Sequence, residues 1–122
     1  MTTAEIAARL VTLCRQQQWE IAQRELYAAD ATSTEPHEAP GFPKEVRGLE
    51  GIVAKGHHFA AGIETMHALT VSDPLVAHGV FAVTMSMDVT MKGQPRMQMS
   101  ELCVYEVKGD KISAERFFFG GC

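Results

Sequence analysis

The spacing of apolar residues changes near residue 64, and this change constrains the fold more than any other feature. Before it, apolar side chains recur at the 3.6-residue period of a helix, and after it they alternate at the period of two typical of a strand. Three turn signals follow, at Ser72-Asp73-Pro74, Lys92-Gly93-Gln94-Pro95 and Lys108-Gly109-Asp110. They predict strands near 64–71, 76–91, 96–107 and 111–119. Tight turns join consecutive strands in antiparallel fashion, so we expect a four-stranded meander.

The first half of the chain predicts helices that cover one face of this meander. Residues 2–28 indicate two helical pieces with a bend at the three glutamines 16–18, and Thr2 and Glu5 have capping-box spacing. Residues 31–35 are typical of a short strand that Pro36 ends, and a proline-rich loop follows over 36–47. Residues 48–64 predict a third helix, which Gly56 would allow to approach the sheet closely. The predicted class is α+β, with one domain over 1–122.

Composition limits the cellular location and the classes of binding partner that are expected for this protein. The 122 residues are 46% apolar with a net charge of −4, which argues against nucleic acid and against anionic membranes as partners. Cys14, Cys103 and Cys122 form no C-x-x-C motif, and the first residues lack the basic and apolar segments of a signal peptide. We therefore expect a cytoplasmic protein, in which Cys122 is exposed and prone to oxidation.

Three stretches carry a family resemblance: residues 26–32 leading to Glu35-Pro36, residues 48–52 opening the third helix, and residues 101–112 running into Phe117-Phe118. Together with the element order, they resemble the SnoaL-like branch of the nuclear-transport-factor-two-like superfamily, which includes ketosteroid isomerases and polyketide cyclases. The resemblance implies a curved antiparallel sheet wrapped around three helices as a cone with a pocket inside. It also implies a homodimer formed through the outer face of the sheet. Because this scaffold serves many activities, function has to be argued from the site.

Two glutamates are the first candidates for catalysis. Glu35 precedes Pro36, where ketosteroid isomerases place a general-base aspartate, although a solvated carboxylate at a strand end would also fit. Glu101 lies amid an alternating apolar set, so an inward orientation would raise its pKa and let it donate a hydrogen bond. Such a glutamate could instead be satisfied by a hydroxyl, a histidine or Arg116. The opposite register would expose Glu101 and bury Leu102 and Val104.

His67 is the third catalytic candidate, because it alternates with Ile63, Leu69 and Val71 on the expected inner face of its strand. A histidine of the core bonded to a polar neighbour is the alternative. His57 and His58 are adjacent on a helix and point about 100° apart, so we expect no metal site. No phosphate loop, dinucleotide fingerprint or flavin motif occurs, so we expect no cofactor.

Aromatic residues and methionines are the expected walls of the pocket. Methionines at period two on neighbouring strands predict a flexible apolar surface, although plain core filling is an alternative. The expected ligand-binding residues are Tyr27, Phe59, Met85, Met87, Met99, Tyr105 and Phe117. The first helix is aliphatic near Leu10 and Val11, where the isomerases carry a tyrosine, which argues against steroid isomerase activity.

Two functions stay open from the sequence. The first is an enzyme of the isomerase, cyclase or dehydratase type, which transfers a proton next to a carbonyl on a small apolar molecule with Glu35 as base and Glu101 as hydrogen-bond donor. The second is a non-catalytic module of the same fold that binds a ligand or assembles a dimer. The two differ in whether the loss of Glu101 abolishes turnover.

Overall fold

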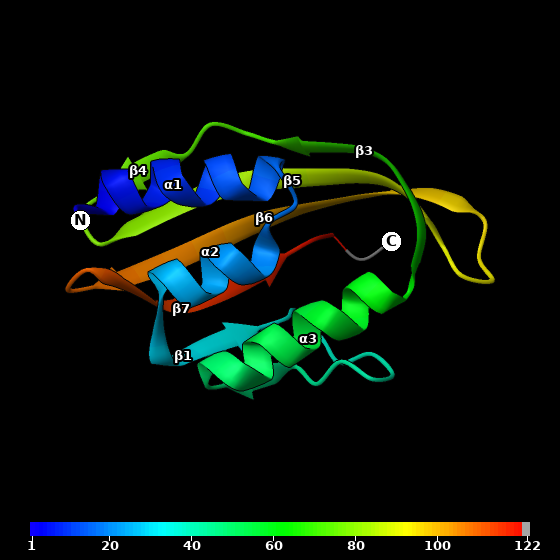
Figure 1. Ribbon diagram of the computed structural model, residues 1–122, viewed down its shortest axis with the longest axis horizontal. Coiled ribbons are helices and arrows are strands. Elements are labelled where there is room, and N and C mark those ends of the chain that lie inside the picture. Colours follow the sequence, from blue (N-terminus) through cyan, green and yellow to red (C-terminus); the bar gives the residue numbers. More distant parts are fainter. Residues whose placement is uncertain (121–122) are drawn as a thin grey trace.

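One seven-stranded sheet and three helices make up residues 1–120, the part of the chain that the computed structural model describes (Figure 1). The expectation for Cys122 lies outside these residues. The helices are α1 (Thr3–Arg15), α2 (Trp19–Leu26) and α3 (Leu49–Ala61). The strands are β1 (Tyr27–Thr34), β2 (Glu45–Arg47), β3 (Ile63–Val71), β4 (Leu75–Ala77), β5 (Val80–Met91), β6 (Arg96–Lys108) and β7 (Lys111–Phe118).

The strands are hydrogen-bonded in the order β2-β1-β7-β6-β5-β3, and β4 pairs with β5. Every pairing is antiparallel except that of β1 with β7, which is parallel. The α+β class and the curved, mostly antiparallel sheet are thus confirmed, and the parallel pair is a departure from a purely antiparallel sheet. It arises because β1 enters the sheet beside the last strand of the meander rather than beside its first.

Two predicted strand boundaries were wrong. The strand expected over 76–91 is split into β4 and β5 by a turn at His78 and Gly79, where Gly79 has a φ of +76° that glycine adopts at little cost. The strand expected to start at residue 31 begins at Tyr27, directly after α2. The loop over 36–47 also ends in β2, which pairs with β1.

The predicted start and end of the first helix are confirmed. The Thr2 hydroxyl accepts a hydrogen bond from the Glu5 amide, and the Glu5 carboxylate accepts one from the Thr2 amide. The bend falls at Gln17, whose positive φ of 58° interrupts the helical path. The buried stripe of α1, which includes Ile6, Leu10 and Leu13, belongs to the main core.

The helices lie along the sheet with α1 over β4 and β5, and α3 near β1 at the other side (Figure 1). The expected close approach of Gly56 to the sheet was wrong, because a Cβ at Gly56 would meet the side chain of Gln23 on α2. The tight approach is at Gly51, where a Cβ would lie 2.9 Å from Val46 of β2. No helix within residues 1–120 is long and apolar enough to cross a membrane.

Candidate functional site

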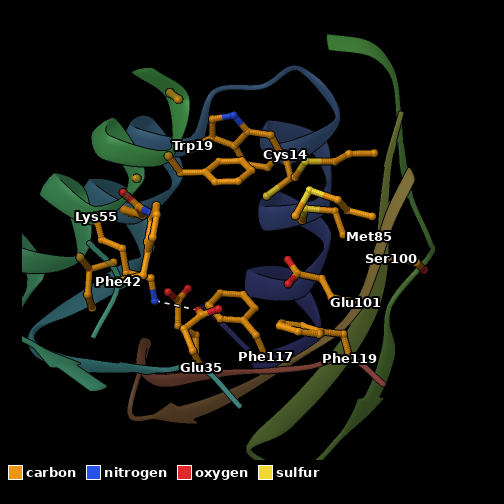
Figure 2. Close-up of a pocket in the computed structure, with 18 of the residues that line it drawn as sticks. Cys14, Trp19, Glu35, Phe42, Lys55, Met85, Ser100, Glu101, Phe117 and Phe119 are labelled. Carbon is orange, nitrogen blue, oxygen red and sulfur yellow. Dashed lines mark hydrogen bonds and ion pairs between the residues drawn. The ribbon is translucent and has the colours of Figure 1, made fainter. Parts of the chain in front are cut away.

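A cavity of about 800 Å³ lies between the sheet and the helices (Figure 2). All seven side chains expected to form the wall line it: Tyr27, Phe59, Met85, Met87, Met99, Tyr105 and Phe117. Further aromatic side chains that the sequence reasoning did not name complete the wall: Trp19, Phe42 and Phe119. The wall is therefore mostly apolar, and binding of a ligand by these residues stays a prediction.

The methionines form one continuous surface of this wall. Met87 of β5 is the direct cross-strand partner of Met99 of β6, and Met85 is the partner of Glu101. Met66 of β3 also lines the cavity, with Val89 of β5 as its cross-strand partner. The flexible thioether of Met85 thus lies directly across from Glu101, the carboxyl group that β6 directs into the cavity.

Glu101 points from β6 into the cavity, with Leu102 exposed on the opposite face. The inward register is therefore the one the chain adopts. The hydrogen-bond partner of the Glu101 carboxylate is the thiol of Cys103, with 3.8 Å between Sγ and Oε1. Burial first, and then the negative charge of Glu35, raise the pKa of Glu101 from 4.5 to about 7.

Glu35 follows β1 and is held in place on both sides. Its backbone amide donates to the Lys44 carbonyl at 2.7 Å, and its Oε2 accepts a hydrogen bond from Lys55 Nζ at 2.8 Å. The side chains of Glu35 and Lys55 are 20% and 14% exposed, so this ion pair is largely shielded from water. Glu35 is thus neither a solvated carboxylate nor a free one.

A buried carboxylate that the sequence reasoning missed completes the polar part of the site. Glu115 of β7 is 4% exposed, and it accepts hydrogen bonds from the hydroxyls of Tyr27 and Ser33. Ser33 in turn accepts a hydrogen bond from Lys55 Nζ at 2.8 Å. Burial raises the pKa of Glu115, while these two hydroxyls and the charge of Lys55 oppose that rise.

The sequence contained signals for both missed residues. Glu115 is two positions before Phe117, so it shares the face of β7 that was expected to line the pocket. Lys55 is three positions after Ile52 and four before Phe59, which places it on the inner stripe of α3. In each case the available signal was a charged residue at a position where the sequence pattern places apolar residues facing the core.

His67 does not lie in the cavity, and its predicted inner position was wrong. The pairing of β3 with β5 contains two irregularities, between Ile63 and Thr65 and between Met66 and Ala68, and these shift the alternation of faces. Met66 therefore lines the cavity, while His67 is exposed and its Nε2 lies 2.8 Å from Thr90 Oγ1. The catalytic role for His67 loses its geometric basis.

The two buried thiols are not poised as nucleophiles. Burial raises the pKa of Cys14, which lines the cavity, to about 12, and burial also raises the pKa of Cys103. Both thiols are therefore protonated at neutral pH. Within residues 1–120, no group of three or more histidine, cysteine, aspartate or glutamate side chains is placed to hold a metal ion.

Comparison with known families agrees with this architecture. The sequence model of the SnoaL-like domain matches residues 1–119. The chain belongs to the SnoaL-like family. A protein from Mesorhizobium loti, provisionally assigned as a SnoaL-like polyketide cyclase, shares 33% identity with this SnoaL-like chain at a TM-score of 0.90, covering 98% of this chain and all of the other. Comparison with curated protein sequences gives no significant match.

More distant structures share the fold of this SnoaL-like protein. A ketosteroid isomerase-like protein from Catenulispora acidiphila, in complex with trimethylamine, is 19% identical with a TM-score of 0.73 over 98% of this chain and 88% of its own. TerC, co-crystallised with polyporic acid, is 14% identical with a TM-score of 0.77 over 95% of this chain and 89% of its own. At these identities the likeness concerns the fold alone.

Proposed function

We propose that this SnoaL-like protein binds a small, mostly apolar molecule in its cavity and transfers a proton at a carbon next to a carbonyl group. The observation that carries the proposal is Glu101, a carboxyl with a pKa of about 7 inside an apolar cavity and without a cationic hydrogen-bond partner in residues 1–120. A general base is most effective when its pKa lies near the working pH. Family membership and the ligands named for TerC and the Catenulispora protein support small-molecule binding.

In this mechanism Glu101 acts as the base. Its ionised carboxylate removes a proton from the carbon next to the carbonyl, and the C–H electron pair moves into the enolate. The protonated carboxyl then returns the proton to the same carbon or to a conjugated one, which yields exchange or isomerisation without any other reactant. Glu35 was expected to be the base, but its ion pair with Lys55 occupies the carboxylate, so we assign the role to Glu101.

The proposal is tested by exchange of α-protons in D₂O, followed by proton NMR, with a panel of ketones, enones and β-keto esters. The wild-type protein is expected to accelerate exchange for at least one class, and Glu101→Gln is expected to lower that rate by roughly a hundredfold or more. The matched control is Glu106→Gln on the same strand, whose carboxylate pairs with Arg116 away from the cavity.

The outcomes separate an enzyme from a binding module. Binding of panel members without accelerated exchange would favour the non-catalytic ligand-binding function. An equal rate in wild type and Glu101→Gln would show that Glu101 is not the base, even if exchange occurs. Loss of exchange in Glu106→Gln as well would point to a general loss of structure rather than to loss of the base.

A homodimer remains part of the proposal. Leu102 and Phe118 are direct cross-strand partners on the outer face of β6 and β7, and both side chains are exposed. Burial of such a pair against a second copy would remove apolar surface from water. Light scattering after size exclusion, on wild type and on Leu102→Glu, tests this dimer. The cytoplasmic location also stays a prediction.

A further inference from the structure

Lys55 has an unusual position for a lysine. Of the side chains in residues 1–120 that line the cavity, it is the one lysine, and no arginine lines it. The side chain is 14% exposed, and its Nζ lies 5.2 Å from the centre of the Phe117 ring. A lysine ammonium is costly to bury, so one that is largely withdrawn from water calls for a physical reason.

The contacts of Lys55 use two of its three N–H groups. One N–H donates to Glu35 Oε2 and another to Ser33 Oγ, each at 2.8 Å. An ammonium has three donors, so one donor is left over from the contacts within residues 1–120. Figure 2 shows Lys55 beside Glu35 at the cavity, with Glu101 on a different wall. Lys55 itself lines the cavity, so we infer that the remaining donor is the one that a molecule in the cavity accepts from.

Glu115 holds the ammonium in this position through Ser33. Because the Ser33 hydroxyl donates its hydrogen to Glu115 Oε2, its oxygen is free to accept from Lys55 Nζ. The direction of each bond is thus determined along Lys55, Ser33 and Glu115. With Glu35 on its other side, the ammonium is positioned by two carboxylates and one hydroxyl, which is the preorganisation that an electrostatic site requires.

We propose that Lys55 is the oxygen-binding group of the cavity, which donates a hydrogen bond to the carbonyl oxygen of the ligand and stabilises the enolate that forms there. This inference rests on the proposed function and deepens it. It names the substrate class as enolisable ketones and β-dicarbonyl compounds with an apolar body, oriented with the oxygen toward α3 and the acidic carbon toward β6.

The movement of charge during proton transfer supports this assignment. When Glu101 takes the proton, its negative charge disappears and an equal charge develops on the enolate oxygen. The net charge of the cavity does not change, but the negative charge comes to lie against an ammonium in a low-dielectric environment, where the attraction is strongest. The largely shielded Glu35–Lys55 pair therefore acts as a fixed dipole with its positive end at the developing oxyanion.

Paired ligands of the same shape provide the test. 2-Naphthol mimics an enol, and 2-methylnaphthalene has a methyl group in place of the oxygen, so the ratio of their affinities isolates the oxygen contact. We expect the wild-type protein to bind 2-naphthol at least tenfold more tightly, as a hydrogen bond to a charged group provides. Lys55→Met should abolish this preference while 2-methylnaphthalene still binds, and Lys55→Arg should restore part of it.

Matched controls separate the possible failures. Lys108→Met removes an exposed lysine outside the cavity and should leave the affinity ratio unchanged. If neither naphthalene binds the wild-type protein, the proposed cavity function falls together with this inference. If both bind and the preference is absent or survives Lys55→Met, the role of Lys55 alone is overturned. Should Lys55→Met not fold, the ¹⁵Nζ NMR signal of Lys55 in the wild-type protein must shift with 2-naphthol and not with 2-methylnaphthalene.

Discussion

Ser33 and Glu115 are direct partners in the parallel pairing of β1 with β7, and the Ser33 hydroxyl donates to Glu115 Oε2 at 2.6 Å. Both side chains are buried, so the hydrogen bonds of the carboxylate come from its neighbours in the fold rather than from water. Tyr27 supplies the second hydroxyl to Glu115. The register of this strand pair thus determines whether the buried carboxylate is satisfied, and through Ser33 it also determines where Lys55 lies.

Ser33→Ala is expected to lower the free energy of unfolding by about 1 to 3 kcal/mol, because it leaves a buried carboxylate oxygen without one of its donors. Urea denaturation followed by circular dichroism measures the change. Ser86→Ala is the control, since Ser86 bonds Ser100 in an exposed position and its loss should cost less than about 0.5 kcal/mol. Equal effects in the two variants would contradict the buried network.

Glu101→Gln is expected to stabilise the protein at high pH. A carboxyl whose pKa is raised by folding binds its proton more tightly in the folded state, so its ionisation opposes folding. The contribution of Glu101 to the stability of the wild type is therefore lost as the pH rises from about 4.5 through about 7, and the Gln variant lacks this one contribution. The predicted advantage of Glu101→Gln is on the order of 3 kcal/mol at pH 8 and close to zero at pH 4.

Denaturation of both proteins across this pH range checks the prediction, with Glu106→Gln as the matched variant. Glu106 is half-exposed and bonds Arg116, so its replacement should not reproduce the pH dependence. A stability difference between wild type and Glu101→Gln that is independent of pH would show that the carboxyl titrates normally.

The charges around Glu101 are expected to move its pKa in opposite directions. Burial is the main reason for the raised pKa, the Glu35 carboxylate adds to it, and Lys55 reduces it. Glu35→Gln should therefore lower the pKa of Glu101, and Lys55→Met should raise it further. Titration of ¹³C-labelled glutamate side chains by NMR measures both, and changes of the same sign in the two variants would contradict the arrangement.

Buried and exposed methionines of the cavity wall are expected to contribute differently to the free energy of unfolding. Met85 is 6% exposed and faces Glu101 across β5 and β6, whereas Met99 is 37% exposed. Met85→Ala should cost about 2 to 4 kcal/mol, and Met99→Ala less than about 1 kcal/mol, because truncation at depth removes more buried contact. Thermal or urea unfolding compares the two, and a larger loss in Met99→Ala would contradict their placement.

His67→Ala is expected to leave both stability and ligand affinity nearly unchanged. The ring is exposed and bonds Thr90 on the outer side of the sheet, so its removal should cost less than about 0.5 kcal/mol. Binding of 2-methylnaphthalene by fluorescence titration, together with denaturation, tests this. A loss of binding in this variant would show that His67 contributes to the ligand site, contrary to its exposed position.

The sequence by itself determined the three helices, three turns of the meander and seven of the side chains that line the cavity. These features follow from local rules: the period of apolar residues distinguishes helix from strand, and the Thr2 cap and the turn at Gly109 depend on nearby residues. Glu101 on the inner face of β6 also followed from alternation, once the register was known to bury Cys103 and Tyr105.

The tertiary structure alone decided which polar groups meet. Irregular pairing in β3 moved His67 to the outside, and an irregularity of this kind depends on the partner strand rather than on local sequence. The polar network joins residues that are distant along the chain. Ser33 of β1 is 22 residues from Lys55 of α3 and 82 residues from Glu115 of β7. Hydrogen bonding and desolvation act through space, so the pKa of Glu101 and the position of Lys55 exist only once these elements have packed together.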